Sequence, residues 1–86
     1  MAVSFRLYSR AGCHLCDEML QELEALQRTT AGVFTVDILD IDRDAETQRR
    51  YSLRIPVLTA KASGVVVCET RFNKQFFLDY LTGTAR

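Results

Sequence analysis

The feature that most constrains this chain is a pair of cysteines, Cys13 and Cys16, placed where a strand gives way to a helix. Residues 3–8 alternate between apolar and polar side chains, which indicates a strand. A turn follows, and apolar residues then recur at helical spacing over residues 14–28. The two cysteines therefore occupy the first residues of a helix, directly after a strand.

This position predicts redox chemistry. Free backbone N–H groups and the positive end of the helix dipole stabilise a thiolate, and such sites lower a cysteine pKa from ~8.5 to roughly 3.5–7.5. A spacing of three puts Cys16 one turn after Cys13, within disulfide reach. We expect Cys13 to be the exposed attacking sulfur and Cys16 the resolving one. Arg10 and a protonated His14 would add positive charge, which the two acidic residues after Cys16 oppose.

Other interpretations of the cysteines fit less well. Two buried cysteines could simply pack as small apolar residues. A zinc site needs four ligands, and only Cys68 and His14 remain, at unsuitable spacing. Cys68 lies in an apolar run and is expected to be a packed strand residue. With three cysteines in the chain, a fully paired disulfide framework is excluded.

The remaining pattern predicts an α/β domain of order β-α-β-α-β-β-α over residues 1–86. The further elements are a strand over 33–41, a short helix ending near 51, strands over 55–60 and 65–69, and a last helix that Asn73 caps and Gly83 ends. Asp42 or Asp44 can cap the short helix. A right-handed parallel crossover and a tight antiparallel hairpin then give a four-stranded mixed sheet with helices on both faces. An aromatic stripe is expected in the core: Phe72, Phe76, Phe77 and Tyr80.

Size and charge limit the partners. With 11 basic and 11 acidic residues among 86, the formal net charge is zero, so nothing favours nucleic acid or an anionic membrane. No segment approaches the roughly 20 apolar residues of a membrane span, and the first residues do not resemble a signal peptide. We expect a cytoplasmic monomer.

The run from Leu7 to Cys16 resembles the strand, turn and C-x-x-C motif of a glutaredoxin, a member of the thioredoxin-fold superfamily. The tripeptide Arg54-Ile55-Pro56 resembles the cis-proline loop of that family. The motif Cys-His-Leu-Cys-Asp resembles that of a group of uncharacterised bacterial glutaredoxin-like proteins.

The resemblance implies roles for individual residues. Cys13 would be the nucleophile, with Cys16 resolving, and the Ile55–Pro56 bond would be cis. The N–H and C=O of Ile55 would be free to bind an extended substrate, and Arg10 would meet a glutathione carboxylate. His14, inside the motif, joins the substrate-binding candidates. The glycine pair that follows the fourth strand in glutaredoxins is absent from residues 69–73, which predicts weak use of glutathione.

Three functions remain open. The leading hypothesis is a thiol–disulfide oxidoreductase that reduces protein or glutathione-mixed disulfides, without a bound cofactor, with glutathione or a reductase as the electron donor. The alternative is a thioredoxin-fold binding or redox-sensing module with little turnover. A third is a glutathione-assisted iron–sulfur cluster held between two subunits through Cys13.

Overall fold

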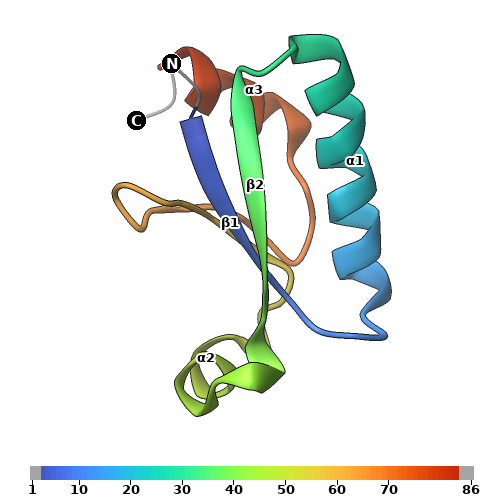
Figure 1. Ribbon diagram of the computed structural model, residues 1–86, viewed down its shortest axis with the longest axis vertical. Coiled ribbons are helices and arrows are strands. Elements are labelled where there is room, and N and C mark those ends of the chain that lie inside the picture. The colour runs from blue at the N-terminus through green and yellow to red at the C-terminus, as the bar shows by residue number, and fades with distance from the viewer. Residues whose placement is uncertain (1–2, 84–86) are drawn as a thin grey trace.

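A computed structural model of the chain describes residues 3–83, whose element order confirms the predicted β-α-β-α-β-β-α succession (Figure 1). A single 3-10 turn is added between β2 and α2. The elements are β1 (Val3–Ser9), α1 (His14–Thr30), β2 (Phe34–Asp40), η1 (Ile41–Arg43), α2 (Ala45–Tyr51), β3 (Val57–Ala60), β4 (Val66–Glu69) and α3 (Lys74–Thr82).

The four strands form one mixed sheet in the order β2-β1-β3-β4. β1 and β2 run parallel, as the crossover through α1 requires, whereas the pairs β1–β3 and β3–β4 are antiparallel. This is the predicted four-stranded mixed sheet, and it puts the dithiol at the end of a central strand.

The core lies between one face of the sheet and the helices α1 and α3. Phe5 and Leu7 alternate with polar neighbours along β1, so both point to the same face and are buried there. The ring of Phe5 lies 5.0 Å from that of Phe77 on α3. Met19 and Leu23 of α1 complete this part of the core. Burial of these side chains fixes the start of α1 against the sheet.

The other face of the sheet is covered by α2 at one end only. Tyr8 points away from the core side, and its ring stacks on Tyr51 of α2 at 4.3 Å between centroids. α2 itself has no buried residue, and it lies beyond the carboxyl end of β2 in Figure 1. Helices therefore lie on both faces, as predicted, but their contributions are unequal.

Several boundaries differ from the prediction. The third strand begins at Val57 rather than at residue 55, because the two preceding residues form a loop. α1 continues to Thr30 and ends at Ala31, which has a left-handed φ of 45°. Phe76 is 39% exposed, so the aromatic stripe is not entirely core. No helix within residues 3–83 is long and apolar enough to cross a membrane.

Candidate redox site

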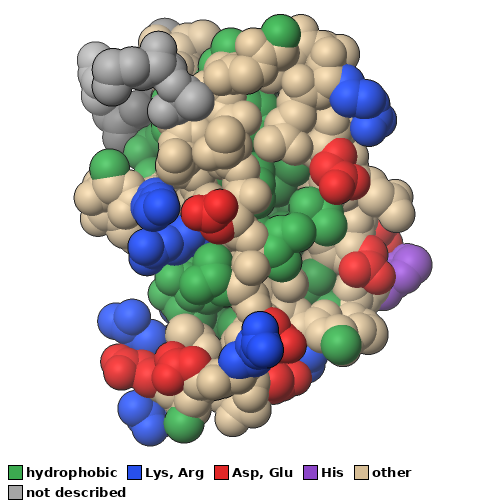
Figure 2. Space-filling model, in the orientation of Figure 1, with side chains coloured by type: hydrophobic (Ala, Val, Ile, Leu, Met, Phe, Trp, Pro, Cys, Tyr) green, Lys and Arg blue, Asp and Glu red, His purple; other side chains and the backbone are tan. Residues whose placement is uncertain are grey.

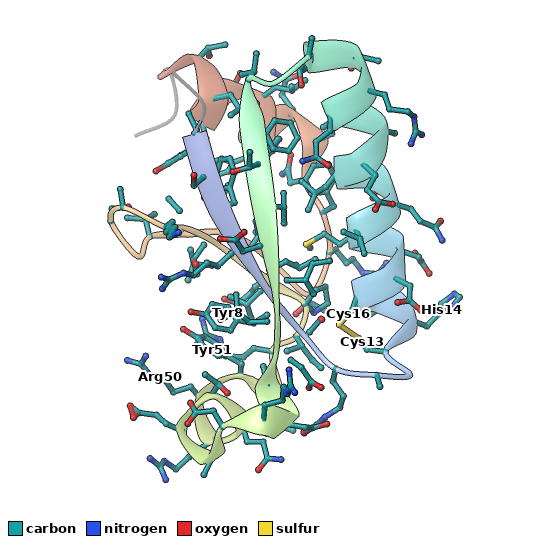
Figure 3. All side chains as sticks on the ribbon, viewed as in Figure 1. Tyr8, Cys13, His14, Cys16, Arg50 and Tyr51 are labelled. Carbon is teal, nitrogen blue, oxygen red and sulfur yellow. A yellow bond between two sulfur atoms is a disulfide. The ribbon has the colours of Figure 1, made fainter. Side chains whose placement is uncertain are left out.

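Cys13 and Cys16 form a disulfide at the N-terminus of α1, with 5.2 Å between their Cα atoms (Figure 3). Gly12, with a φ of 79°, makes the turn that brings the chain from β1 into the helix. Cys13 is the N-cap: its Sγ accepts the N–H of Cys16 at 3.1 Å, and its C=O accepts the N–H of Asp17. The redox pair is thus part of the hydrogen bonding that starts the helix.

The two sulfur-bearing residues differ in accessibility. Cys13 is partly exposed, whereas Cys16 is 2% exposed and belongs to the buried side of α1. An incoming sulfur atom can therefore reach Cys13 more readily than Cys16. This asymmetry agrees with the roles expected from the sequence, in which Cys13 attacks and Cys16 resolves.

His14 points away from the disulfide. Its side chain is 88% exposed and its Nε2 lies 2.9 Å from Oε2 of Glu18, one turn along α1. Figure 3 shows the imidazole on the outer side of the helix, opposite the direction of the sulfur atoms. In Figure 2 the purple histidine has acidic neighbours on the α1 side, whereas positive and negative side chains are interleaved around α2. The role of His14 in substrate binding stays a prediction.

Arg10 does not present a free positive charge. Its Nη2 donates to Oδ1 of Asp42 at 2.7 Å, and its Nε contacts both carboxylate oxygens at 3.0 Å. Gln48 donates to the same carboxylate at 2.9 Å. The hydrogen bond from Arg10, followed by that from Gln48, lowers the pKa of Asp42. The charge expected to assist Cys13 or to meet glutathione is therefore largely neutralised.

The cis-proline loop connects α2 to β3. The Ile55–Pro56 peptide bond is cis, which confirms the prediction, and Pro56 is buried. The expectation for Ile55 was wrong in one respect, because its N–H donates to the C=O of Tyr51 at 3.0 Å. Its C=O accepts no hydrogen bond from the described part of the chain. Thr70 fixes the other side of the loop: its N–H donates to the C=O of Pro56 at 2.7 Å.

A second set of contacts, made by Arg54, holds this loop and was not predicted from the sequence. Arg54 donates from Nη2 and Nε to the carboxylate of Glu69 on β4, at 3.1 and 3.2 Å. Its Cζ lies 5.3 Å from the ring centre of Tyr51, which stacks in turn on Tyr8. The hydrogen bond from Arg54 lowers the pKa of Glu69. These contacts join β1, α2, the proline loop and β4.

The segment after β4 takes an unusual conformation without glycine. Thr70 has a φ of 66°, and the N–H of Arg71 donates to the C=O of Glu69 at 2.7 Å, which closes a three-residue turn. A β-branched residue rarely adopts this region. The left-handed backbone that a glycine favours is therefore present here although the glycine is not.

Cys68 is a packed strand residue, as predicted. It is 6% exposed, and its Sγ donates to the C=O of Asn73 at 3.9 Å. Burial raises the pKa of this thiol. Within residues 3–83 no group of three or more His, Cys, Asp or Glu side chains is placed to hold a metal ion.

Known proteins resemble this chain in sequence and fold. A family model described as a glutaredoxin-like domain (DUF836) matches residues 5–82. The solution NMR structure of protein Ne2328 from Nitrosomonas europaea is 30% identical, with a TM-score of 0.81 over 93% of this chain and 92% of that one. The X-ray structure of protein XcR50 from X. campestris is 35% identical, with a TM-score of 0.66 over 92% and 96%.

A third structure, of a malarial protein, is 16% identical and covers 96% of both chains with a TM-score of 0.65. At that identity the likeness concerns the fold alone. A comparison with curated protein sequences found no match.

Proposed function

The chain belongs to the glutaredoxin-like domain family (DUF836), and on that basis we propose that it is a thiol–disulfide oxidoreductase. As a thioredoxin-fold protein with a dithiol at a helix N-terminus, it is a redox module. The observation that carries the proposal is the unequal exposure of the pair, with Cys13 accessible at the N-cap of α1 and Cys16 buried one turn later. The proposed substrates are protein disulfides and, less efficiently, glutathione-mixed disulfides.

The proposed reaction has two exchange steps. The thiolate of Cys13 attacks a substrate disulfide R–S–S–R′, forms a mixed disulfide with R–S, and releases R′–S⁻, which takes up a proton. Cys16 then loses its proton, attacks Sγ of Cys13 and releases the second substrate thiol. The substrate gains two electrons, and the protein ends as the Cys13–Cys16 disulfide. Glutathione or a reductase returns the two electrons to the protein.

Binding of the substrate backbone is proposed at the proline loop. The free C=O of Ile55 can accept an N–H from an extended segment, in the manner of strand addition. Only one of the two groups of Ile55 is available, and Arg10 is engaged by Asp42. Both observations support weak binding of glutathione compared with an ordinary glutaredoxin.

The same two observations favour the alternative of a binding or redox-sensing module with little turnover. Turnover separates the two functions. A catalyst reduces many equivalents of 2-hydroxyethyl disulfide or insulin when dithiothreitol or glutathione is supplied, whereas a sensor stops after one equivalent.

Variants of the pair test the proposal. We expect Cys13→Ser to abolish exchange, because no other accessible thiol occupies the helix N-terminus. Cys16→Ser should accumulate a mixed disulfide on Cys13 that intact-mass measurement detects. Circular dichroism checks that each variant is folded. Full activity in Cys13→Ser would show that the dithiol is not the reacting group.

A further inference from the structure

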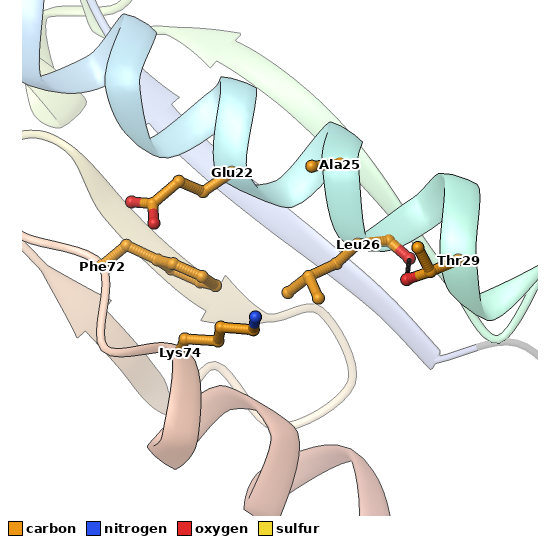
Figure 4. Close-up of a pocket in the computed structure, with 6 residues that line it drawn as sticks. All are labelled: Glu22, Ala25, Leu26, Thr29, Phe72 and Lys74. Atoms are coloured by element: carbon orange, nitrogen blue, oxygen red, sulfur yellow. Dashed lines mark hydrogen bonds between the residues drawn. The ribbon is translucent and has the colours of Figure 1, made fainter.

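We propose that a groove along α1, remote from the dithiol, binds one apolar side chain of an extended protein substrate; the inference rests on the proposed oxidoreductase function. The groove, here called the α1 groove, lies between α1 and the segment that leads into α3, and it measures about 230 Å³ (Figure 4). Its lining consists of Glu22, Ala25, Leu26, Thr29, Phe72 and Lys74.

The α1 groove continues towards the N-terminal end of α1, the end that carries the dithiol. A smaller hollow of about 150 Å³ shares Glu22 and Phe72 with the groove and is lined at its other end by Leu15. Leu15 lies between the two cysteines in the sequence. A segment whose sulfur is joined to Cys13 can therefore continue along α1 into the groove.

The floor of the groove is apolar. Phe72 is only partly buried, although its ring packs 5.4 Å from that of Phe77 in the core. Leu26 is likewise partly buried, and Ala25 leaves its side of the groove open. A volume of about 230 Å³ is smaller than the 300–1,000 Å³ typical of sites for whole ligands, and it suits a single large side chain.

The two rims of the groove carry opposite charges that form no ion pair within residues 3–83. Glu22 stands on the α1 side of the groove and Lys74 on the other, and Arg71 lines the adjoining smaller hollow. No hydrogen bond or ion pair engages these three side chains within the described residues. An extended peptide offers N–H groups to a carboxylate and C=O groups to an ammonium or guanidinium group. The two rims therefore complement an uncharged backbone with an apolar side chain between them.

The geometry also sets a register. The substrate sulfur is joined to Cys13, and a helix rises 1.5 Å per residue, so Leu26 lies about 20 Å along α1 from that cysteine. An extended chain covers that span in about six residues at ~3.3 Å each. The bound side chain should consequently lie about six positions from the substrate cysteine, on one side of it only.

The test uses reduced wild-type protein and a series of Gly/Ser peptides. Each peptide carries one cysteine, which forms a mixed disulfide with thionitrobenzoate. It also carries one Phe, two to seven positions before or after that cysteine. The release of thionitrobenzoate is followed by absorbance. We expect a maximum in rate at about six positions on one side. It should exceed the rate of the peptide without Phe by about ten- to a hundredfold, as expected for burial of one aromatic side chain.

Two variants on α1 form a matched pair. Ala25→Trp fills the groove and should remove the maximum, whereas Glu24→Trp, exposed and outside the groove, should retain it. Lys74→Glu reverses one rim and should lower the rate of the best peptide severalfold. It places an acidic residue in the first turn of α3, which favours the helix, so unfolding would not explain the loss.

The outcomes are distinguishable. If wild-type protein reduces all peptides at one rate, or if Ala25→Trp keeps the maximum, the groove is not the binding site and the oxidoreductase function stands. If no peptide is reduced, the proposed function itself fails. A wild-type dimer in sedimentation that Ala25→Trp dissociates would assign the groove to a second copy of the chain and overturn the peptide proposal.

Discussion

At the residue scale, three cysteines with one chemistry are placed in three different environments. Cys13 is accessible at the start of a helix, Cys16 lies on the buried side of the same helix, and Cys68 is inside the sheet. Accessibility and thiolate formation both govern the reactivity of a thiol. We therefore expect the three thiols to be modified at different rates.

In the reduced protein, limiting iodoacetamide near pH 7 should modify Cys13 well before the other two cysteines. Cys16 and Cys68 are 2% and 6% exposed, and burial raises the pKa of the Cys68 thiol. Peptide mass spectrometry of samples quenched at increasing times gives the three rates. Cys68 reacting first would contradict the assignment of the site.

The Arg10–Asp42 pair should limit the use of glutathione. In Asp42→Asn the guanidinium loses its charged partner and becomes available to a ligand carboxylate. We expect turnover of a glutathione-mixed disulfide to rise severalfold, measured with glutathione and glutathione reductase. The double variant Arg10→Gln/Asp42→Asn is the control and should lose the gain. A gain that persists in it would show that Arg10 is not the group released.

The same pair makes stability depend on pH in one direction. Arg10 holds the pKa of Asp42 below its ordinary value of about 3.8, so the folded state favours the carboxylate. This stabilisation is complete above the ordinary pKa and is lost as the pH falls through the lower value of the folded state. The urea midpoint of the wild type should exceed that of Asp42→Asn at pH 7, and the two should converge towards pH 2. A constant difference would contradict the pKa shift.

Single residues also show what a sequence can reveal of the site. Cys13 and Cys16 were found because spacing and local pattern fix their place at a helix start. The partner of Arg10 lies 32 positions away in an exposed turn, and no local pattern identifies it. The contact between Arg54 and Glu69 was not predicted for the same reason, because it depends on how the loop after α2 meets β4.

At the scale of elements, α3 depends on a cap that the sequence predicted. Asn73 accepts the N–H of Phe76 through its side-chain oxygen at 3.0 Å. We expect Asn73→Ala to lower the free energy of unfolding by about 1 kcal/mol. Asn73→Ser should keep most of the wild-type stability, because serine can also cap a helix. Urea denaturation followed by circular dichroism measures both. Equal losses in the two variants would mean that the cap is not responsible.

The elements were predictable where one pattern dominates. The alternation of apolar and polar residues predicted β1, and the helical spacing of apolar residues predicted α1. Side-chain caps marked the starts of α2 and α3: Asp44, one of the two residues considered for α2, and Asn73 for α3. Prediction failed where tertiary contacts decide. β3 starts late because Ile55 bonds to Tyr51 of α2 and Pro56 to Thr70, the residue after β4. Thr70 itself is left-handed although its side chain disfavours this conformation.

At the scale of the whole molecule, stability rests on a small aromatic core. Phe77 is fully buried and packs against Phe5 and Phe34, with ring centres 5.0 Å away in both cases. Phe77→Ala should cost about 3–5 kcal/mol, a large part of the 5–15 kcal/mol typical of a domain. The adjacent Phe76, 39% exposed, is the matched control, and Phe76→Ala should cost about 1 kcal/mol or less. Similar urea midpoints for the two variants would contradict this core.

The N-cap at Cys13 links the folding of the chain to its affinity for electrons. A thiolate carries a full charge and accepts the N–H of Cys16 more strongly than a disulfide sulfur does. Folding and reduction form one thermodynamic cycle, so any free energy that the reduced sulfur adds to this cap raises the reduction potential of the pair by the equivalent amount. The difference between the unfolding free energies of the reduced and oxidised forms therefore measures, without an electrode, how far folding makes this protein an oxidant or a reductant.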